Sequence, residues 1–151
     1  MKLRGLASAK YADYAPEFPA QVRTAAQRAG LRYEASVMKR LKSLFKDVRV
    51  GPWILYKAAN KSGICQPDAL VWLSSKLVLV VEVKLTHQRK AREKLVDFYG
   101  PLVQKLHPGA EVAYLQVFKN SKPAAHKRLV PFYEIEKHTK AGKYRECQIL
   151  L

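Results

Sequence analysis

Apolar side chains recur at three- and four-residue steps from about residue 19 to residue 45, which is the spacing of a helix buried along one side. Leu31 and Phe45 belong to this apolar stripe, and most of the basic residues of the stretch turn away from it. Gly30 could divide the stretch into two helices. A second, strongly basic helix is expected over about residues 87–106.

Shorter stretches rich in valine, leucine and aromatic residues indicate β-strands. Strands are expected over residues 48–57, 68–73, 77–85 and 112–118, and a final segment with Tyr144, Ile149 and Leu150 can add an edge strand. The third strand is apolar on both faces, which is typical of a central strand. Gly51-Pro52 interrupts the first strand, Ser74-Ser75-Lys76 forms a tight turn before the third, and Gly100-Pro101 breaks or kinks the second helix.

The order helix, three strands, helix, strand predicts an α/β fold in which a sheet is flanked by helices. Residues 58–66 are expected to form a polar loop, and residues 119–131 a basic connection with room for a short helix after Pro123. A chain of 151 residues is long enough for one domain with a real core. We expect this domain over residues 21–151, preceded by a poorly ordered arm over residues 1–20.

The charge of the chain is unusual, because 28 Lys and Arg residues exceed 12 Asp and Glu residues and give a net charge of +16. Such an excess indicates a polyanionic partner, with nucleic acid first and an anionic membrane surface second. The alternative is a basic protein that its charge keeps soluble. No apolar run reaches the ~20 residues that span a bilayer, so no membrane segment is expected.

The cysteines and histidines are too scattered to indicate a disulfide framework or a zinc site. Cys65 and Cys147 are isolated, which fits a reducing intracellular compartment such as the cytoplasm.

Acidic residues stand beside two nearly continuous apolar runs, at Pro67-Asp68 and at Glu82-Val83-Lys84. Glu82 and Lys84 point to the same face of a strand, about 7 Å apart along it. Counting back from the tight turn places Asp68 opposite them on the neighbouring strand. Two carboxylates at this spacing suit Mg²⁺ or Mn²⁺, and the carbonyl of Val83 could add a ligand. The alternative is a structural cluster of salt bridges, which is a costly way to stabilise a core.

Glu34 lies within the apolar stripe of the first helix, where a carboxylate without a partner would cost several kcal/mol. If the stripe packs on the sheet, Glu34 can meet the metal-binding cluster. The alternative, weighed evenly, is that it reaches solvent or pairs with Lys84 or an arginine.

In a chain this basic, the simplest substrate for such a metal is a phosphodiester. Asp68 and Glu82 would hold the metal, and Lys84 could orient or deprotonate the attacking water or offset charge in the transition state. Thr86 and Gln88 follow and could touch phosphate, although a role as plain surface residues is the favoured interpretation for both.

Pro67-Asp68, thirteen intervening residues and Glu82-Val83-Lys84, preceded by Glu34, resemble the PD-(D/E)XK nuclease superfamily. Arg32-Tyr33-Glu34 and Gln66-Pro67-Asp68 are most similar to archaeal-type Holliday junction resolvases, which also occur in viruses. The resemblance covers about residues 28–118. A serine or threonine that resolvases often supply before the second strand has no clear counterpart, and Ser62 is the candidate.

The resemblance implies a restriction-endonuclease-like core with a central mixed sheet, in the order α-β-β-β-α-β. It also implies Mg²⁺ dependence, a homodimer with two active sites, and paired nicks across a four-way DNA junction. By position it carries metal binding to Asp68 and Glu82, a catalytic role to Lys84 and a supporting role at the metal site to Glu34.

Basic residues cluster in several places that could contact DNA phosphates, and no base-reading motif accompanies them, so recognition of backbone shape is expected. The candidate DNA-binding residues are Arg28, Arg32, Lys57, Lys61, Ser62, Gln88, Arg89 and Lys90, and a further basic cluster includes Lys119, Lys122, Lys127 and Arg128. The apolar stripe of the second helix (Tyr99, Leu102, Val103, Leu106) favours a core over a dimer interface.

Two rival functions remain open at the level of sequence. One keeps the chemistry but changes the substrate to linear DNA, as in a phage-type exonuclease or a restriction-like endonuclease. The other is a non-catalytic DNA-binding protein with a nuclease-like fold, against which the intact Asp68, Glu82 and Lys84 argue.

Overall fold

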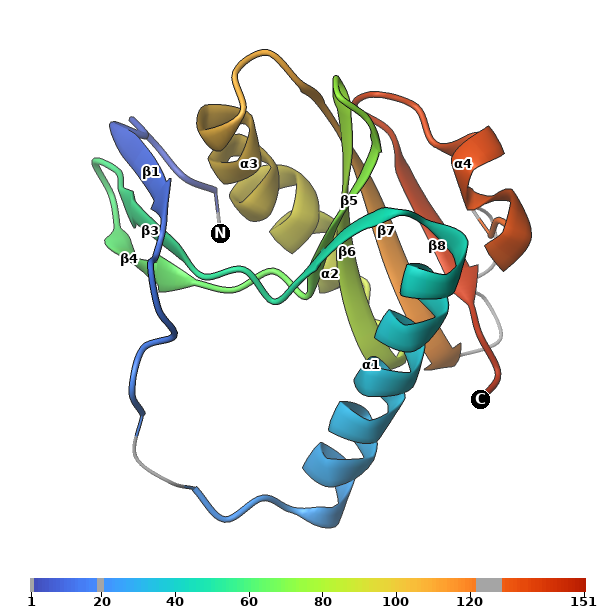
Figure 1. The fold of residues 1–151 in the computed structure, drawn as a ribbon. Helices are drawn as coiled ribbons and strands as arrows, with labels where there is room; N and C mark the ends of the chain where they lie inside the picture. The colour runs from blue at the N-terminus through green and yellow to red at the C-terminus, as the bar shows by residue number, and fades with distance from the viewer. Residues whose placement is uncertain (1, 19–20, 122–128) are drawn as a thin grey trace.

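The computed structural model describes residues 2–18, 21–121 and 129–151, which form two β-sheets and the helices packed on them (Figure 1). The larger sheet has five strands in the order β2-β5-β6-β7-β8, and the smaller has three in the order β1-β3-β4. The expected α/β fold, with a sheet flanked by helices, is therefore confirmed. The short helix expected after Pro123 and the basic residues Lys122, Lys127 and Arg128 lie outside the described residues.

The larger sheet is mixed, because its strands are joined in two different ways. Its strands are β2 (Asp47–Val50), β5 (Ala69–Ser74), β6 (Leu77–Thr86), β7 (Glu111–Asn120) and β8 (Tyr144–Gln148). The tight turn between β5 and β6 makes them antiparallel, whereas a helical crossover makes β6 and β7 parallel. The expected central place of β6 and the expected edge strand near the C-terminus are both confirmed.

Helix α1 (Ala25–Leu44) covers one face of this sheet (Figure 1). It begins at Thr24, whose hydroxyl accepts a hydrogen bond from the backbone of Gln27 while the Gln27 side chain accepts one from Thr24 N–H. Its buried side, including Val37 and Leu41, packs on the valines and leucines of β5, β6 and β7. The helix continues through Gly30, so the expected division does not occur.

The opposite face is covered by one continuous helical stretch, formed by α2 (Lys90–Glu93), the π-helix η1 (Lys94–Tyr99) and α3 (Gly100–Leu106). Pro101 has no N–H to donate to Asp97 O, and Gly100 N–H instead donates to Leu95 O, five residues back. Gly100-Pro101 therefore widens the helix and does not end it. A Cβ on Gly100 would lie 2.4 Å from the Tyr114 hydroxyl, so glycine permits the close approach to β7.

The apolar stripe of this stretch lies in the core, as favoured from the sequence: Tyr99, Leu102 and Val103 are buried. Leu102 joins Leu3, Ile54 and Tyr56 in a small core beneath the three-stranded sheet.

The smaller sheet was not foreseen. Its strands are β1 (Ser8–Tyr11), β3 (Ile54–Lys57) and β4 (Ser62–Cys65). The single strand expected over residues 48–57 is instead β2 and β3 in different sheets, because the chain turns at Gly51, which has a φ of 55°. Residues 62–65, expected in a loop, form β4, and β1 lies in the segment expected to be a poorly ordered arm.

The C-terminal region adds the 3₁₀-helix η2 (Phe132–Glu134) and the single-turn helix α4 (Ile135–His138) before β8. Ile135 is buried and packs on the same core as α1. None of the helices in the described ranges is long and apolar enough to cross a membrane.

Candidate active site

The sequence-predicted carboxylates meet where β5 begins and β6 nears its end. Ala69 pairs with Val81 across the antiparallel ladder, so the next residues outward, Asp68 and Glu82, lie side by side and point to the same face. Val83 N–H donates a hydrogen bond of 2.7 Å to Asp68 Oδ2 and fixes that side chain. The backbone of Gly51 donates to Asp68 O, after which β2 and β5 separate.

Glu82 is the buried centre of the group, with only 3% of its surface exposed. Its Oε1 lies 3.4 Å from Lys84 Nζ and 3.7 Å from Lys94 Nζ. Its Oε2 is buried without any hydrogen-bond partner in the described part of the chain. A buried carboxylate oxygen without a donor is strongly disfavoured, so this atom indicates a site for a ligand.

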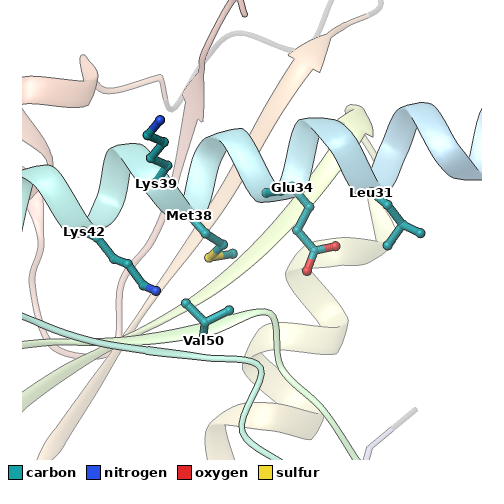
Figure 2. Close-up of a pocket in the computed structure, with 7 residues that line it drawn as sticks. Leu31, Glu34, Met38, Lys39, Lys42 and Val50 are labelled. Carbon is teal, nitrogen blue, oxygen red and sulfur yellow. The ribbon is translucent and has the colours of Figure 1, made fainter.

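Glu34 approaches the same group from α1, and its carboxylate projects below the helix in Figure 2. It is only partly buried, yet it is close enough to interact with both Asp68 and Glu82. The side chain therefore does not simply turn into solvent, although the structure gives it no ion pair within salt-bridge distance in the described residues.

Burial is the main cause of the acidity shifts in this group. Burial raises the pKa of Asp68 to about 6, and the charge of Glu34 adds to the effect, whereas the Val83 N–H and Lys84 oppose it. Burial also raises the pKa of Glu82 to about 7, with Asp68 adding and the two lysines opposing. The pKa of Glu34 is raised by burial and by Glu82. All three carboxylates lack enough positive charge around them.

A divalent cation fits this deficit, because Asp68 and Glu82 supply hard oxygen ligands and Glu82 Oε2 has no hydrogen-bond partner in residues 2–18, 21–121 and 129–151. The Val83 carbonyl and Glu34 are the remaining predicted ligands. Within the described ranges, no three His, Cys, Asp or Glu side chains are already gathered as a metal-binding group.

A cationic hollow of about 280 Å³ opens beside Glu82. Its lining residues are Lys84, Gln88, Lys90, Ala91, Glu93 and Lys94. Lys94 also lies at the site, although it is not among the candidate residues named from the sequence. The available signal was its position one helical turn after Lys90, on the side that faces the sheet.

A second polar network lies next to the hollow. The side-chain amide of Gln116 accepts from Gln88 N–H at 2.9 Å and donates to Gln88 O at 3.0 Å, so it holds the β6–α2 turn. The same amide donates to the Tyr144 hydroxyl, which donates to Glu146 Oε2. His87 pairs with that Glu146 oxygen. The sequence analysis did not identify Gln116 or Glu146, because they lie in strands far along the chain.

The predicted DNA-binding residues divide into two groups. Gln88, Arg89 and Lys90 are exposed beside the cationic hollow, and Arg28 and Arg32 are exposed in the N-terminal half of α1. Lys57, Lys61 and Ser62 are exposed at the outer end of the β3–β4 hairpin, on the other side of the molecule from α1 (Figure 1). The structure does not bring this second group to the carboxylates.

Comparison of the chain with family models, with curated proteins and with solved structures gave no match.

Proposed function

We propose that this protein is a Mg²⁺-dependent endonuclease that cuts DNA at branched structures, with four-way junctions as the expected substrate. The observation that carries the proposal is the buried Glu82 Oε2, which has no hydrogen-bond partner among the residues that the structure describes although it lies next to a second carboxylate and two lysines. A net charge of +16 favours a polyanionic substrate. The mixed sheet, with carboxylates on adjacent antiparallel strands and a preceding helix that supplies Glu34, supports a restriction-endonuclease-like core.

The residues of the site have distinct tasks in this proposal. Asp68, Glu82 and the Val83 carbonyl would hold the cation, with Glu34 in support. Bound Mg²⁺ would offset charge that builds on the phosphate and favour attack by water. Lys84 is partly exposed and close to Glu82, so its ammonium can reach a phosphate oxygen or a water beside it. Lys94 adds positive charge at the same oxygen, and Lys90 and Gln88 lie where neighbouring phosphates would pass.

A homodimer with two such sites is part of the proposal, because resolution of a four-way junction needs two symmetric nicks. Cutting of linear DNA, either from an end or internally, is the main competing activity for the same site. The cationic hollow would suit a phosphodiester in either substrate.

The test is cleavage of a synthetic mobile four-way junction in Mg²⁺, with the nicks mapped on each strand and linear duplex and single-stranded DNA tested alongside. We expect paired symmetric nicks, and we expect Asp68→Asn to abolish them while DNA binding is kept. Asp47→Asn, an exposed carboxylate on β2, is the matched control and should cut normally. Absence of cleavage by the parent protein with Mg²⁺ or Mn²⁺ on every substrate would contradict the proposal and favour a DNA-binding protein.

A further inference from the structure

A groove of about 430 Å³ runs between α1 and β2 and shares Glu34 with the candidate active site. The residues that line this α1–β2 groove are Leu31, Glu34, Ala35, Met38, Lys39, Lys42 and Val50. Figure 2 shows Leu31, Glu34, Met38 and Lys42 directed to the side of α1 that faces Val50, whereas Lys39 points away. One end of the groove is therefore acidic and adjoins the site, and Lys42 stands toward the other end.

Apart from Glu34 and the two lysines, the side chains that line the groove are apolar. Met38 lies between Glu34 and Lys42 along α1, whereas Leu31 lies on the far side of Glu34 from Lys42 (Figure 2). Leu31 and Val50 are each 43% exposed, and Met38 beneath them is 5% exposed. Leucine, valine and methionine on facing elements offer an apolar surface that a ligand can cover. Glu34 and Lys42 are eight residues apart in α1, or about 12 Å along the helix axis. This length can accommodate a nucleotide between the site and the ammonium of Lys42.

The two approaches to the carboxylates differ in chemistry. On one side the cationic hollow offers Lys84, Lys90 and Lys94, which suit the charged backbone of DNA. On the other side the groove offers aliphatic walls, which gain little from a duplex whose bases are stacked inside and whose phosphates face outward. Aliphatic side chains such as leucine and methionine do contact bases when a base step is unstacked.

We propose that the α1–β2 groove binds the base and sugar of an unpaired nucleotide that adjoins the scissile phosphate, with Lys42 at the next phosphate along the strand. This inference rests on the proposed nuclease function and narrows its substrate. The phosphates on one side of the cut would lie over the cationic hollow. On the other side of the cut, one unstacked base would pack against Leu31, Met38 and Val50. Branched DNA, flaps and bubbles supply such a nucleotide, and an unbroken duplex does not.

The test measures binding without cleavage, on the full chain in EDTA. Two DNAs of equal length are compared, one fully paired and one with three central unpaired nucleotides that include 2-aminopurine, whose fluorescence reports unstacking. We expect the parent protein to bind the unpaired DNA about tenfold more tightly and to change its fluorescence. The double variant Leu31→Ser/Val50→Ser should reduce that ratio to near one. Leu55→Ser, at a residue of the smaller sheet that is 36% exposed, is the matched control and should keep it.

Equal affinities of the parent for both DNAs would overturn the inference, as would an unchanged ratio in the double variant. Thermal melting of the variant ensures that a lost ratio does not reflect unfolding. If the parent protein sediments as a dimer and the double variant as a monomer, the groove is an interface between two copies of the chain and the inference is wrong. The proposed nuclease function is tested separately from the groove. If the parent protein prefers the unpaired DNA but shows no metal-dependent cleavage, the nuclease proposal is overturned and the groove inference is not.

Discussion

Two acidic groups lie on one row of the larger sheet, yet their carboxylate oxygens differ in whether the surrounding residues supply hydrogen-bond partners. Glu82 of β6 is in register with Gln116 of β7, which is in register with Glu146 of β8. Glu146 Oε2 receives the Tyr144 hydroxyl and pairs with His87, and the Gln116 amide lies 3.3 Å away. Glu82 Oε2 has no partner in the described chain, and its neighbour Asp68 is a further acid.

The contrast separates a structural role from a functional one. Around Glu146 the donors match the acceptors, so the network stabilises the fold and fixes the β6–α2 turn through Gln88. Around Glu82, Asp68 and Glu34 three acids face two lysines, and burial raises the pKa of each acid. Such clusters of buried acids are typical of functional sites, which makes the group around Glu82 the candidate active site and the network around Glu146 its support.

The largest expected difference between the two groups is in activity, and the same substitution tests both. Glu82→Gln should reduce Mg²⁺-dependent cleavage at least about 10³-fold, because one charged ligand and the partner of Lys84 and Lys94 are lost. Glu146→Gln should reduce it by less than about tenfold, through a looser β6–α2 turn. Single-turnover cleavage of a four-way junction measures both. Equal losses in the two variants would mean that the partnered network is as close to the chemistry as Glu82.

The two variants should rank in the opposite order in their loss of stability. Glu146→Gln should lower the free energy of unfolding by about 2 kcal/mol, since it removes the charged acceptor that the Tyr144 hydroxyl and His87 share within a nearly buried network. Glu82→Gln should cost little in metal-free protein at pH 8, because the substitution removes a buried charge that has an oxygen without a partner. Urea denaturation in EDTA measures both values. A Glu82→Gln variant that is the less stable of the two would contradict the assignment of roles.

The sequence was sufficient for those parts of the site that depend on local pattern. The tight turn, which the structure places at Ser75-Lys76, pairs β5 with β6, and counting back from it predicted that Asp68 lies opposite the neighbourhood of Glu82 and Lys84. A register shift between Trp72 and Ser74, which the sequence did not predict, is part of the pairing that brings Asp68 beside Glu82. The apolar character of β6 on both faces likewise indicated its central place.

The remaining parts depend on contacts between segments far apart in the chain. Gln116 and Glu146 resemble ordinary polar residues in strands until the register of three strands aligns them with Glu82. Lys94 reaches Glu82 only because the helix crosses this end of the sheet. Strands β1 and β4 are short, and they form because Leu3, Ile54 and Leu102 share a small core. Local periodicity contains none of this information.

The smallest expected effect is the dependence of stability on pH, which tests whether the group around Glu82 lacks partners. Burial raises the pKa of Asp68 from 3.8 to about 6 and that of Glu82 from 4.5 to about 7. Between about pH 4 and pH 7 the folded protein thus holds protons that the unfolded chain has released. The contribution of these two protonated carboxyls to stability is fully present below their pKa values in the unfolded chain. It is lost as the pH rises through their pKa values in the folded protein.

Metal-free parent protein should therefore lose stability relative to Asp68→Asn between pH 5 and pH 8, by on the order of 2 kcal/mol. Thermal or urea unfolding of both proteins across that range provides the measurement. Saturating Mg²⁺ at pH 8 should restore the parent and leave Asp68→Asn unchanged, because a ligand that binds only the folded state stabilises it, and the gain increases with the logarithm of the ligand concentration relative to Kd. A parent that gains stability relative to Asp68→Asn as the pH rises would show that Asp68 already has a sufficient partner within the chain. The distinction between the two acidic groups would then disappear.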